Sequence, residues 1–467
     1  MRLYMKMIAA VCFAATAIQA SAQEVRSGYF NETYLYRHNL NPALDNEENY
    51  ISIPFVGNIN ASMMGNFGYE ELVRKNPLYP DRSDKKVTSF MNPYLTNGLT
   101  GFSSGDNKAS GQMKVSVMSA GFKKWGGYNT VELNVRGFAA VSVPYQMFEM
   151  AVNACNKRYD IGDASLDVQA FTELSLGHSR QIDEKLRVGA KAKLLVGMAN
   201  ASVKIENATA DLKDANQWVI TADAKSQVNM NGFKYKTKSK EYYSNPGTYE
   251  YVSDVDMGNP GVSGFGLAVD AGATYKINDD VTVYAALQDL GAILWTNNYV
   301  ASNEQKSFVF DGFHDVDIKS ESGEVLDDKA DRYTDQLLDF LHLSEDGDDG
   351  TRLTGIGGTL NVGLQYTVPT YRQLRIGLLG TTSSYFGWKY RWSELRLSGN
   401  IAPVDWFEGS LSLGVNSYSF NTGFLANFHT KGFNFFLGMD AILGKMSKEF
   451  IPLNSNGGVS FGFNILL

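Results

Sequence analysis

Hydrophobic and polar residues alternate along most of this chain, with the period of two that is typical of β-strands whose two faces meet different surroundings. Residues 131–136 read Val-Glu-Leu-Asn-Val-Arg, and residues 186–196 alternate in the same way over a longer stretch. One face of each segment is aliphatic, and the other carries charge. The pattern predicts an all-β fold built from two-sided strands.

Applied to the whole chain, this rule predicts about 14 strands, an even number as in single-chain bacterial barrels. Short turns alternate with longer links, of which the longest are residues 200–262 and 294–353. A soluble β-sandwich also alternates, but brief turns at one rim and long loops at the other are typical of a transmembrane antiparallel β-barrel. The predicted strands lie near residues 51–67, 112–123, 128–141, 164–180, 185–199, 263–277, 281–293, 354–367, 372–384, 389–401, 406–419, 421–429, 433–444 and 457–467.

Two segments depart from the β pattern. Residues 145–157 and 331–343 show apolar residues at helical spacing. Both fall in long loops by the strand count, so short loop helices are predicted there, with simple loop packing as the alternative.

The two ends of the chain carry targeting signals. Arg2 and Lys6 precede an apolar run over residues 7–18, and Ala-Ser-Ala follows at 20–22, so residues 1–22 are predicted to be a secretory signal peptide. The apolar run is shorter than the roughly 20 residues of a membrane-spanning helix. A lipid-modified Cys12 is the competing interpretation.

The last strand alternates up to Leu467 and resembles the signal read by barrel-assembly machinery, which is an expected partner. We therefore expect an outer-membrane location, outer-membrane lipid around the barrel, and a monomer.

Composition agrees with a barrel. The chain has 45 Gly, 25 Tyr and 27 Phe, and its hydrophobic content is 44% with a mean hydropathy of -0.22. Outer-membrane strands hide their hydrophobicity by alternation, so the average resembles that of a soluble protein. The net charge of -8 offers no basic surface for nucleic acid, which is not an expected partner.

Charged residues on the polar parity are predicted to face the lumen, because a Lys or Arg facing lipid at the midplane would cost roughly 2–4 kcal/mol. These residues are Glu132, Arg136, Asp167, Glu173, Arg187, Lys191, Lys193, Asp270, Lys276, Arg375 and Arg396. Aromatic residues near the predicted strand ends are interpreted as interfacial girdles. They are Trp125, Tyr128, Tyr284, Trp295, Tyr366, Tyr371, Trp388, Tyr390, Trp392 and Trp406.

Asn41, Pro42 and Ala43 precede the first strand and resemble the NPA signature of the long-chain fatty-acid transporter class of barrels. An ordinary Asn-Pro turn is the alternative. The whole chain most resembles a group of Bacteroidota outer-membrane proteins defined only as a domain of unknown function. The resemblance implies an N-terminal hatch over residues 23–48 that plugs a barrel over residues 49–467.

The same resemblance implies passive uptake or binding of hydrophobic small molecules, with a hydrophobic ligand or detergent in the lumen and exit by hatch movement or through the wall. A non-transporting barrel that scaffolds or shuttles surface or secreted proteins is the alternative. A barrel enzyme comes third, since it would need a Ser-His pair at the wall.

Signals for chemistry are weak. Residues 101–105 match GxSxG, but they lie in a predicted loop without a strand-to-helix turn. The five histidines lack the spacing of a zinc site. The acidic stretch 345–350 could bind calcium, but it lacks the ordered ligand spacing of a known calcium loop, and a solvated outer loop is the favoured interpretation. No catalytic residue, metal or cofactor is expected.

Overall fold

The computed structural model describes residues 24–46, 48–79, 86–154, 156–214, 217–243, 247–258, 261–303, 306–312, 316–317, 324–440 and 456–467. The predicted signal peptide, residues 1–22, lies outside the described residues, as does Cys155. Within the described part, the chain is mostly β-strand with a few short helices.

The strands form a closed antiparallel β-barrel of 14 strands, which confirms the predicted fold class. Two short strands, β1 and β2, together take the place of one barrel strand. Both pair with β27 on one side and with β5 on the other, and so close the barrel. The barrel strands in chain order are β1 (Tyr50–Ser52) with β2 (Ile59–Gly65), β5 (Asp106–Lys124), β6 (Gly127–Pro144), β8 (Ala164–Gln181), β9 (Leu186–Asp211), β13 (Gly264–Lys276), β14 (Val281–Trp295), β20 (Arg352–Gly355) with β21 (Gly358–Thr367), β22 (Leu374–Ser384), β23 (Arg391–Val404), β24 (Phe407–Asn416), β25 (Phe420–Thr430), β26 (Phe433–Asp440) and β27 (Gly457–Leu466).

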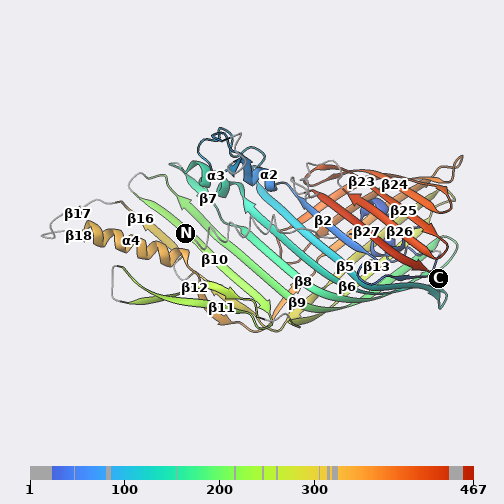
Figure 1. Cartoon of the computed structure of the whole chain (residues 1–467), viewed down its shortest axis with the longest axis horizontal. Helices are drawn as coiled ribbons and strands as arrows, with labels where there is room; N and C mark the ends of the chain where they lie inside the picture. Colours follow the sequence, from blue (N-terminus) through green and yellow to red (C-terminus); the bar gives the residue numbers. More distant parts are fainter. Residues whose placement is uncertain are drawn as a thin grey trace.

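An outer lobe extends the barrel at the end that carries the long loops, drawn on the left in Figure 1, while the short turns and the C-terminus lie on the right. Strand β9 continues well beyond its predicted end and pairs with β10, which pairs in turn with β15 and β16. The remaining elements are α2 (Tyr69–Leu72), β3 (Val73–Lys75), β4 (Val87–Ser89), α3 (Tyr145–Asn153), β7 (Arg158–Asp160), β10 (Trp218–Met230), β11 (Lys234–Glu241), β12 (Thr248–Asp256), β15 (Tyr299–Ser302), β16 (Ser307–Phe310), β17 (Val316–Asp317), β18 (Glu324–Val325), α4 (Leu326–Leu341) and β19 (Ser344–Asp348).

Two β-bulges explain why the sequence pattern did not predict the outer half of β9. The register shifts opposite Ala170 and Phe171, where Met198 is the extra residue, and again near Asn207, whose φ is 47°. Each bulge moves all later side chains to the other face, so a fixed period of two is lost. The predicted long loop therefore contains a continuation of the barrel wall.

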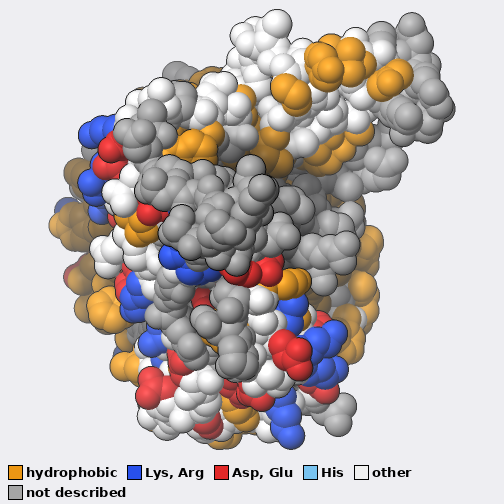
Figure 2. Space-filling model, turned by 90° about the vertical axis from the view of Figure 1, so that its left-hand side faces the viewer, with side chains coloured by type: hydrophobic (Ala, Val, Ile, Leu, Met, Phe, Trp, Pro, Cys, Tyr) orange, Lys and Arg blue, Asp and Glu red, His pale blue; other side chains and the backbone are white. Residues whose placement is uncertain are grey.

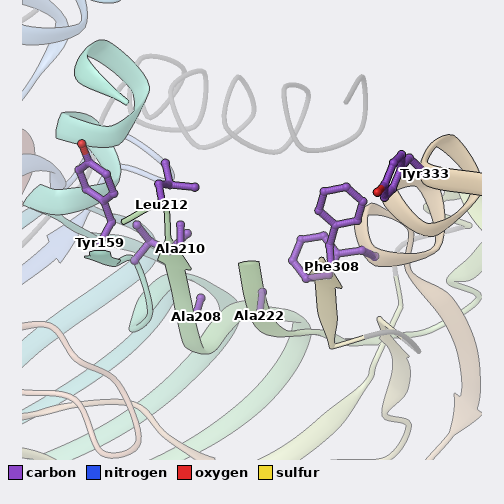
Figure 3. Close-up of a cluster of buried hydrophobic side chains, with 9 residues drawn as sticks. Tyr159, Ala208, Ala210, Leu212, Ala222, Phe308 and Tyr333 are labelled. Atoms are coloured by element: carbon purple, nitrogen blue, oxygen red, sulfur yellow. The ribbon is translucent and has the colours of Figure 1, made fainter. Parts of the chain in front are cut away.

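The helices and the outer strands share an apolar core, shown in Figure 3. Tyr159 of β7, Ala208 and Ala210 of β9, Leu212 just after β9, and Ala222 of β10 lie on one side of it. Phe308 of β16 and Tyr333 and Phe340 of α4 lie on the other side, and Met147 and Met150 of α3 pack against the cluster. Both segments predicted to be loop helices are thus helical and packed by their apolar sides.

The barrel wall has two contrasting faces. On β23, Leu395 and Leu397 are 56% and 49% exposed, whereas their neighbours Glu394 and Arg396 are buried inside. Leu411, 71% exposed on β24, continues the outer apolar surface. The hydrophobic pattern of the sequence therefore sets which face of each strand points outward.

The girdle interpretation is wrong for several aromatic residues. Tyr128, Trp295, Tyr390 and Trp392 are buried inside the barrel, and Tyr284 packs against buried rings of the N-terminal segment. The physical reason is parity, because Trp392 shares the inward face with Glu394 and Arg396. Trp125 and Trp406, by contrast, are 71% and 53% exposed at the short-turn rim.

Candidate functional site: a layered lumen

The interior of the barrel is filled in three layers along its axis. The N-terminal segment, residues 24–46, which we call the hatch, occupies the part nearest the short turns and is visible in blue inside the barrel in Figure 1. Strand β6 shows the order, since Tyr128 contacts the hatch cluster, Glu132 and Arg136 carry charge, and Phe138 lies further toward the outer lobe. The three layers are thus the hatch, a charge layer and an aromatic layer.

The hatch is almost wholly buried and contains two short 3-10 helices, η1 (Arg26–Gly28) and η2 (Leu35–Asn39). It lies against wall positions that carry glycine. A Cβ at Gly377 would be 2.1 Å from Cδ2 of Phe30, and a Cβ at Gly189 would be 2.1 Å from the carbonyl oxygen of Pro42. These glycines let the hatch backbone and rings approach the wall more closely than any side chain would allow.

The Asn-Pro-Ala segment is a wall contact as well as a turn. The Asn41 Nδ2 donates to the Tyr29 hydroxyl at 3.1 Å, and its Oδ1 accepts from the backbone N of Ala43 at 2.9 Å. A Cβ at Gly272 would lie 2.1 Å from this same oxygen. The amide oxygen of Asn41 thus stabilises the turn, and its amide nitrogen links two parts of the hatch through Tyr29. The same side chain packs against β13.

The charge layer begins with a cluster around Arg136. Its guanidinium binds Asp289 through two parallel hydrogen bonds of 2.9 Å, and its Nη1 also lies 2.7 Å from Glu173. Lys193 pairs with the same Asp289 at 2.6 Å and with Asp270 at 2.7 Å. Buried charges remain ionised only when paired in this way, so the cluster is a closed network of two cations and three carboxylates.

Asp289 is the member that the parity rule could not find. A register shift between β13 and β14 places both Gln288 and Asp289 on the inner face, and Asp289 has a φ of 58°. The signal available in the sequence was the successive polar pair itself, which interrupts an otherwise apolar strand. The bulge re-aims one carboxylate into the lumen.

A second cluster joins the start of the hatch to the wall. Arg26 lies 2.9 Å from Glu394, and Arg396 lies 2.7 Å from Glu394 and 3.2 Å from Asp440. Asp440 also accepts from the backbone N of Arg26 at 2.8 Å and from the Ser27 hydroxyl. Arg396 is 1% exposed.

Glu408 anchors the middle of the hatch. It accepts from the backbone N of Glu32 at 3.1 Å and from the backbone N of Thr33 at 2.9 Å. Arg375 pairs with both Glu32 and Glu408. The Glu408 carboxylate thus takes the place of water as the acceptor for two backbone N–H groups of the hatch. The hatch is therefore bound through its backbone as well as through its side chains.

A third group surrounds His38 of the hatch. Its Nδ1 lies 2.8 Å from Lys191, and its Nε2 lies 3.1 Å from the Tyr50 hydroxyl and 3.3 Å from Glu132. Lys114 lies 3.1 Å from Glu24 and 3.8 Å from Glu132, and so continues the group to the first described residue.

The other predicted lumen charges have separate places. Asp167 is buried nearer the outer lobe and accepts from the Ser202 hydroxyl at 2.7 Å, while Arg187 pairs with Asp45 at 2.9 Å. Lys276 shares the inner parity with Asp270 but is exposed, because it is the last residue of β13 at the rim. The parity rule also reaches Lys114, Glu394, Glu408 and Asp440, which were left out of the predicted set.

The aromatic layer closes the lumen above the charges. Phe138 stacks on Tyr385 with a centroid distance of 4.0 Å, and Trp388, Tyr390 and Trp392 complete this group with Met64. A second apolar group covers the opposite side and consists of Phe171, Leu195, Ala268, Ile293, Trp295 and Ile356. Two guanidiniums face the layer from below, with Arg26 4.7 Å from the Trp392 ring centre and Arg136 5.3 Å from that of Phe171.

Two small cavities adjoin the charge layer. They measure about 20 and 60 Å³ and share Glu24 and Arg26 among their lining residues. A single water needs roughly 10–15 Å³, so each has room for one or a few waters. Neither cavity has room for more than these waters.

The other side chains considered for catalysis or metal binding make structural hydrogen bonds. His178 pairs with Asn129 at 2.9 Å, and Asp346 and Asp348 of the acidic segment accept from Ser302 and from the backbone N of Asn298. Among the described residues, no group of three or more His, Cys, Asp or Glu side chains is placed to hold a metal ion. Within the same residues, no helix is long and apolar enough to cross a membrane.

A family model described as a family of unknown function, DUF5723, matches residues 42–440. The chain belongs to this family. The expectation of a family of unknown function is therefore confirmed, and the match begins inside the hatch at Pro42. No curated protein matches this chain.

Solved structures that match this chain include two toluene transporters and a FadL homologue. The toluene transporter TbuX of Ralstonia pickettii shares 8% identity with a TM-score of 0.40 and covers 91% of each chain. The toluene transporter TodX of Pseudomonas putida shares 8% identity with a TM-score of 0.39 and covers 96% of this chain and 93% of its own. A FadL homologue of Pseudomonas aeruginosa shares 9% with a TM-score of 0.37 and covers 94% and 93%. Likenesses at this level carry no argument about what this DUF5723 chain binds.

Proposed function

We propose that this chain is an outer-membrane barrel that binds hydrophobic small molecules at its aromatic layer and admits them by movement of the hatch. The observation that carries the proposal is the order of the layers. Rings and aliphatic side chains line the lumen on the side of the outer lobe, and charges and the hatch lie beneath them. A solute from outside meets apolar surface first.

The outer face supports the membrane location. Leu267, Leu411 and Val415 are 69%, 71% and 58% exposed, and similar side chains surround the barrel. An apolar surface of this extent is unfavourable in water and favourable against acyl chains. On the same strands, Asp270 and Glu408 lie inside and pair with Lys193 and Arg375.

Binding is tested with the hydrophobic fluorophore 1-N-phenylnaphthylamine and the full mature barrel in nanodiscs. Trp392→Ala and Phe138→Ala should weaken the Kd at least tenfold, about 1.4 kcal/mol. Trp125→Ala is the matched control, because Trp125 is exposed at the opposite rim. Equal binding by all three variants, or no binding above protein-free nanodiscs, would contradict the proposal.

Gating by the hatch is tested by locking it to the wall. The hydroxyls of Ser27 and Ser412 are 2.8 Å apart, so Ser27→Cys with Ser412→Cys, in a Cys155→Ser background, offers a short cross-link. Oxidation should stop uptake of radiolabelled toluene by cells that express the variant, and reduction should restore it. Uptake that is unaffected by the cross-link would rule out hatch movement as the route.

A second candidate is a plugged barrel that scaffolds or shuttles surface or secreted proteins. The small size of the cavities beside the charge layer favours it, since spaces of about 20 and 60 Å³ hold no hydrophobic solute. Under this hypothesis the fluorophore does not bind and the cross-link leaves the cellular role unchanged. The two tests above therefore separate the candidates.

A further inference from the structure

The described parts of the long link between β2 and β5, residues 66–79 and 86–105, stand on the outside of the barrel wall. Its base is an apolar cluster in which Phe67, Leu72 and Phe90 pack against Val141 and Val143 of β6. On β6 these valines share the outward parity with Val131 and Val135, which are 38% and 37% exposed further down the strand. We call this loop the lateral arm, because its core continues the outer face and not the lumen.

Beyond its base, the lateral arm exposes large apolar side chains. Tyr94 is 65% exposed, Val87 55%, Leu78 49%, Met91 45% and Tyr79 40%. Figure 1 places α2, which belongs to this loop, at the upper edge of the molecule. Figure 2, a view of the long-loop end, shows hydrophobic side chains gathered on a projection at the same upper edge, outside the outline of the barrel.

Charge accompanies this apolar surface. The β3–β4 hairpin carries Lys75 and Lys86, both exposed and close together, because Lys75 pairs with Val87 across the two strands. A surface of exposed aliphatic and tyrosine side chains beside lysines is complementary to the boundary between acyl chains and anionic headgroups. Tyrosine in particular favours that interface.

We propose that the lateral arm lies on the outer leaflet beside the barrel, with its apolar side chains in the headgroup and acyl boundary and with Lys75 and Lys86 against anionic headgroups. The inference rests on the membrane location proposed above. Its occupant is lipid because the arm is continuous with the lipid-facing side of β6 and leaves the barrel outline at the end where the strands emerge from the bilayer. The arm would fix the height and tilt of the outer lobe.

The experiment uses the full mature chain in the Cys155→Ser background, in vesicles of phosphatidylcholine and phosphatidylglycerol. Single cysteines replace Met91 and Tyr94 and carry an environment-sensitive NBD fluorophore. Leu411→Cys on the barrel face is the lipid reference, and Lys238→Cys on the exposed β11–β12 hairpin is the aqueous reference. Brominated lipid and iodide serve as the two quenchers.

We expect the arm probes to follow the lipid reference, with blue-shifted emission and quenching by brominated lipid at least twofold stronger than at Lys238→Cys. Arm probes that iodide quenches as strongly as the aqueous reference, while Leu411→Cys stays in lipid, would overturn the inference and leave a protein partner as the occupant. If Leu411→Cys is also aqueous, the proposed membrane location fails instead.

The role of charge has its own readout. Lys75→Glu with Lys86→Glu should reduce lipid quenching at the arm in vesicles that contain phosphatidylglycerol and have little effect in pure phosphatidylcholine. A loss that is equal in both vesicle types would contradict headgroup recognition by the lysines.

Discussion

The two ends of the lumen hold their contents by different forces. Near the short turns, the hatch is bound by paired charges and by close contacts at wall glycines, as at Glu394 and Gly377. Near the outer lobe, rings such as Phe138 and Trp392 fill the space by apolar packing. Ion pairs and glycine contacts depend on fixed geometry, whereas apolar packing tolerates exchange of one hydrophobic group for another.

Under the proposed function, this difference suits each end of the lumen to one task. A surface that binds by area alone accepts many hydrophobic molecules, which suits an entrance. A network of ion pairs resists opening because buried charges would lose their partners, and such resistance suits a barrier. The variants below test whether the lower half depends on specific partners as strongly as this comparison requires.

The largest effect is expected for Asp289→Leu. The change leaves Arg136 and Lys193 buried with fewer partners and should lower the free energy of unfolding by about 3–5 kcal/mol. Unfolding in urea from phospholipid vesicles measures it. Arg372→Leu is the matched control, because the Arg372–Asp280 pair is solvent-exposed and should contribute less than about 1 kcal/mol. Similar losses for both variants would show that burial does not set the strength of the network.

An intermediate effect is expected for Gly377→Val. The new side chain would overlap the Phe30 ring, so the hatch should shift and the free energy of unfolding should fall by about 1–3 kcal/mol. Protease cleavage within residues 24–46 should become faster. Gly399→Val serves as control, since a Cβ at Gly399 meets no atom within 4 Å. A hatch equally protected in both variants would argue against the glycine contact as a constraint.

The smallest effect concerns the outer lobe and pH. Burial lowers the pKa of the His342 imidazole to about 4 from its ordinary value of 6.5. Because the unfolded state then binds a proton more readily, the lobe should lose stability as the pH falls from 6.5 to 4, by less than about 1 kcal/mol. Hydrogen exchange in α4 and β12 measures it. His342→Phe keeps the ring beside Tyr251, whose centre is 4.2 Å away, and should abolish the pH dependence.

Much of the barrel could be predicted because the residue pattern of each strand defines which of its faces is apolar. Leu395 and Leu397 against Glu394 and Arg396 define an outer and an inner face without reference to any other strand. The same alternation predicts that Trp392 and Tyr128 face the lumen. The girdle interpretation was wrong because it considered only how close these residues are to the strand ends and not which face of the strand they occupy. The same alternation is enough to predict that charged residues such as Glu408 face the lumen.

The sequence by itself determined which face of each strand is apolar, how many strands close the barrel and which segment precedes the first strand, since these follow from a local period of two and from chain order. Tertiary structure alone decided where that period breaks and what meets across the lumen. Asp289 turns inward through a bulge, Arg136 lies 153 residues away from it in the chain, and Phe30 meets Gly377 only when the barrel has closed. Contacts of this kind depend on register and curvature, which are properties of paired strands and not of any single one.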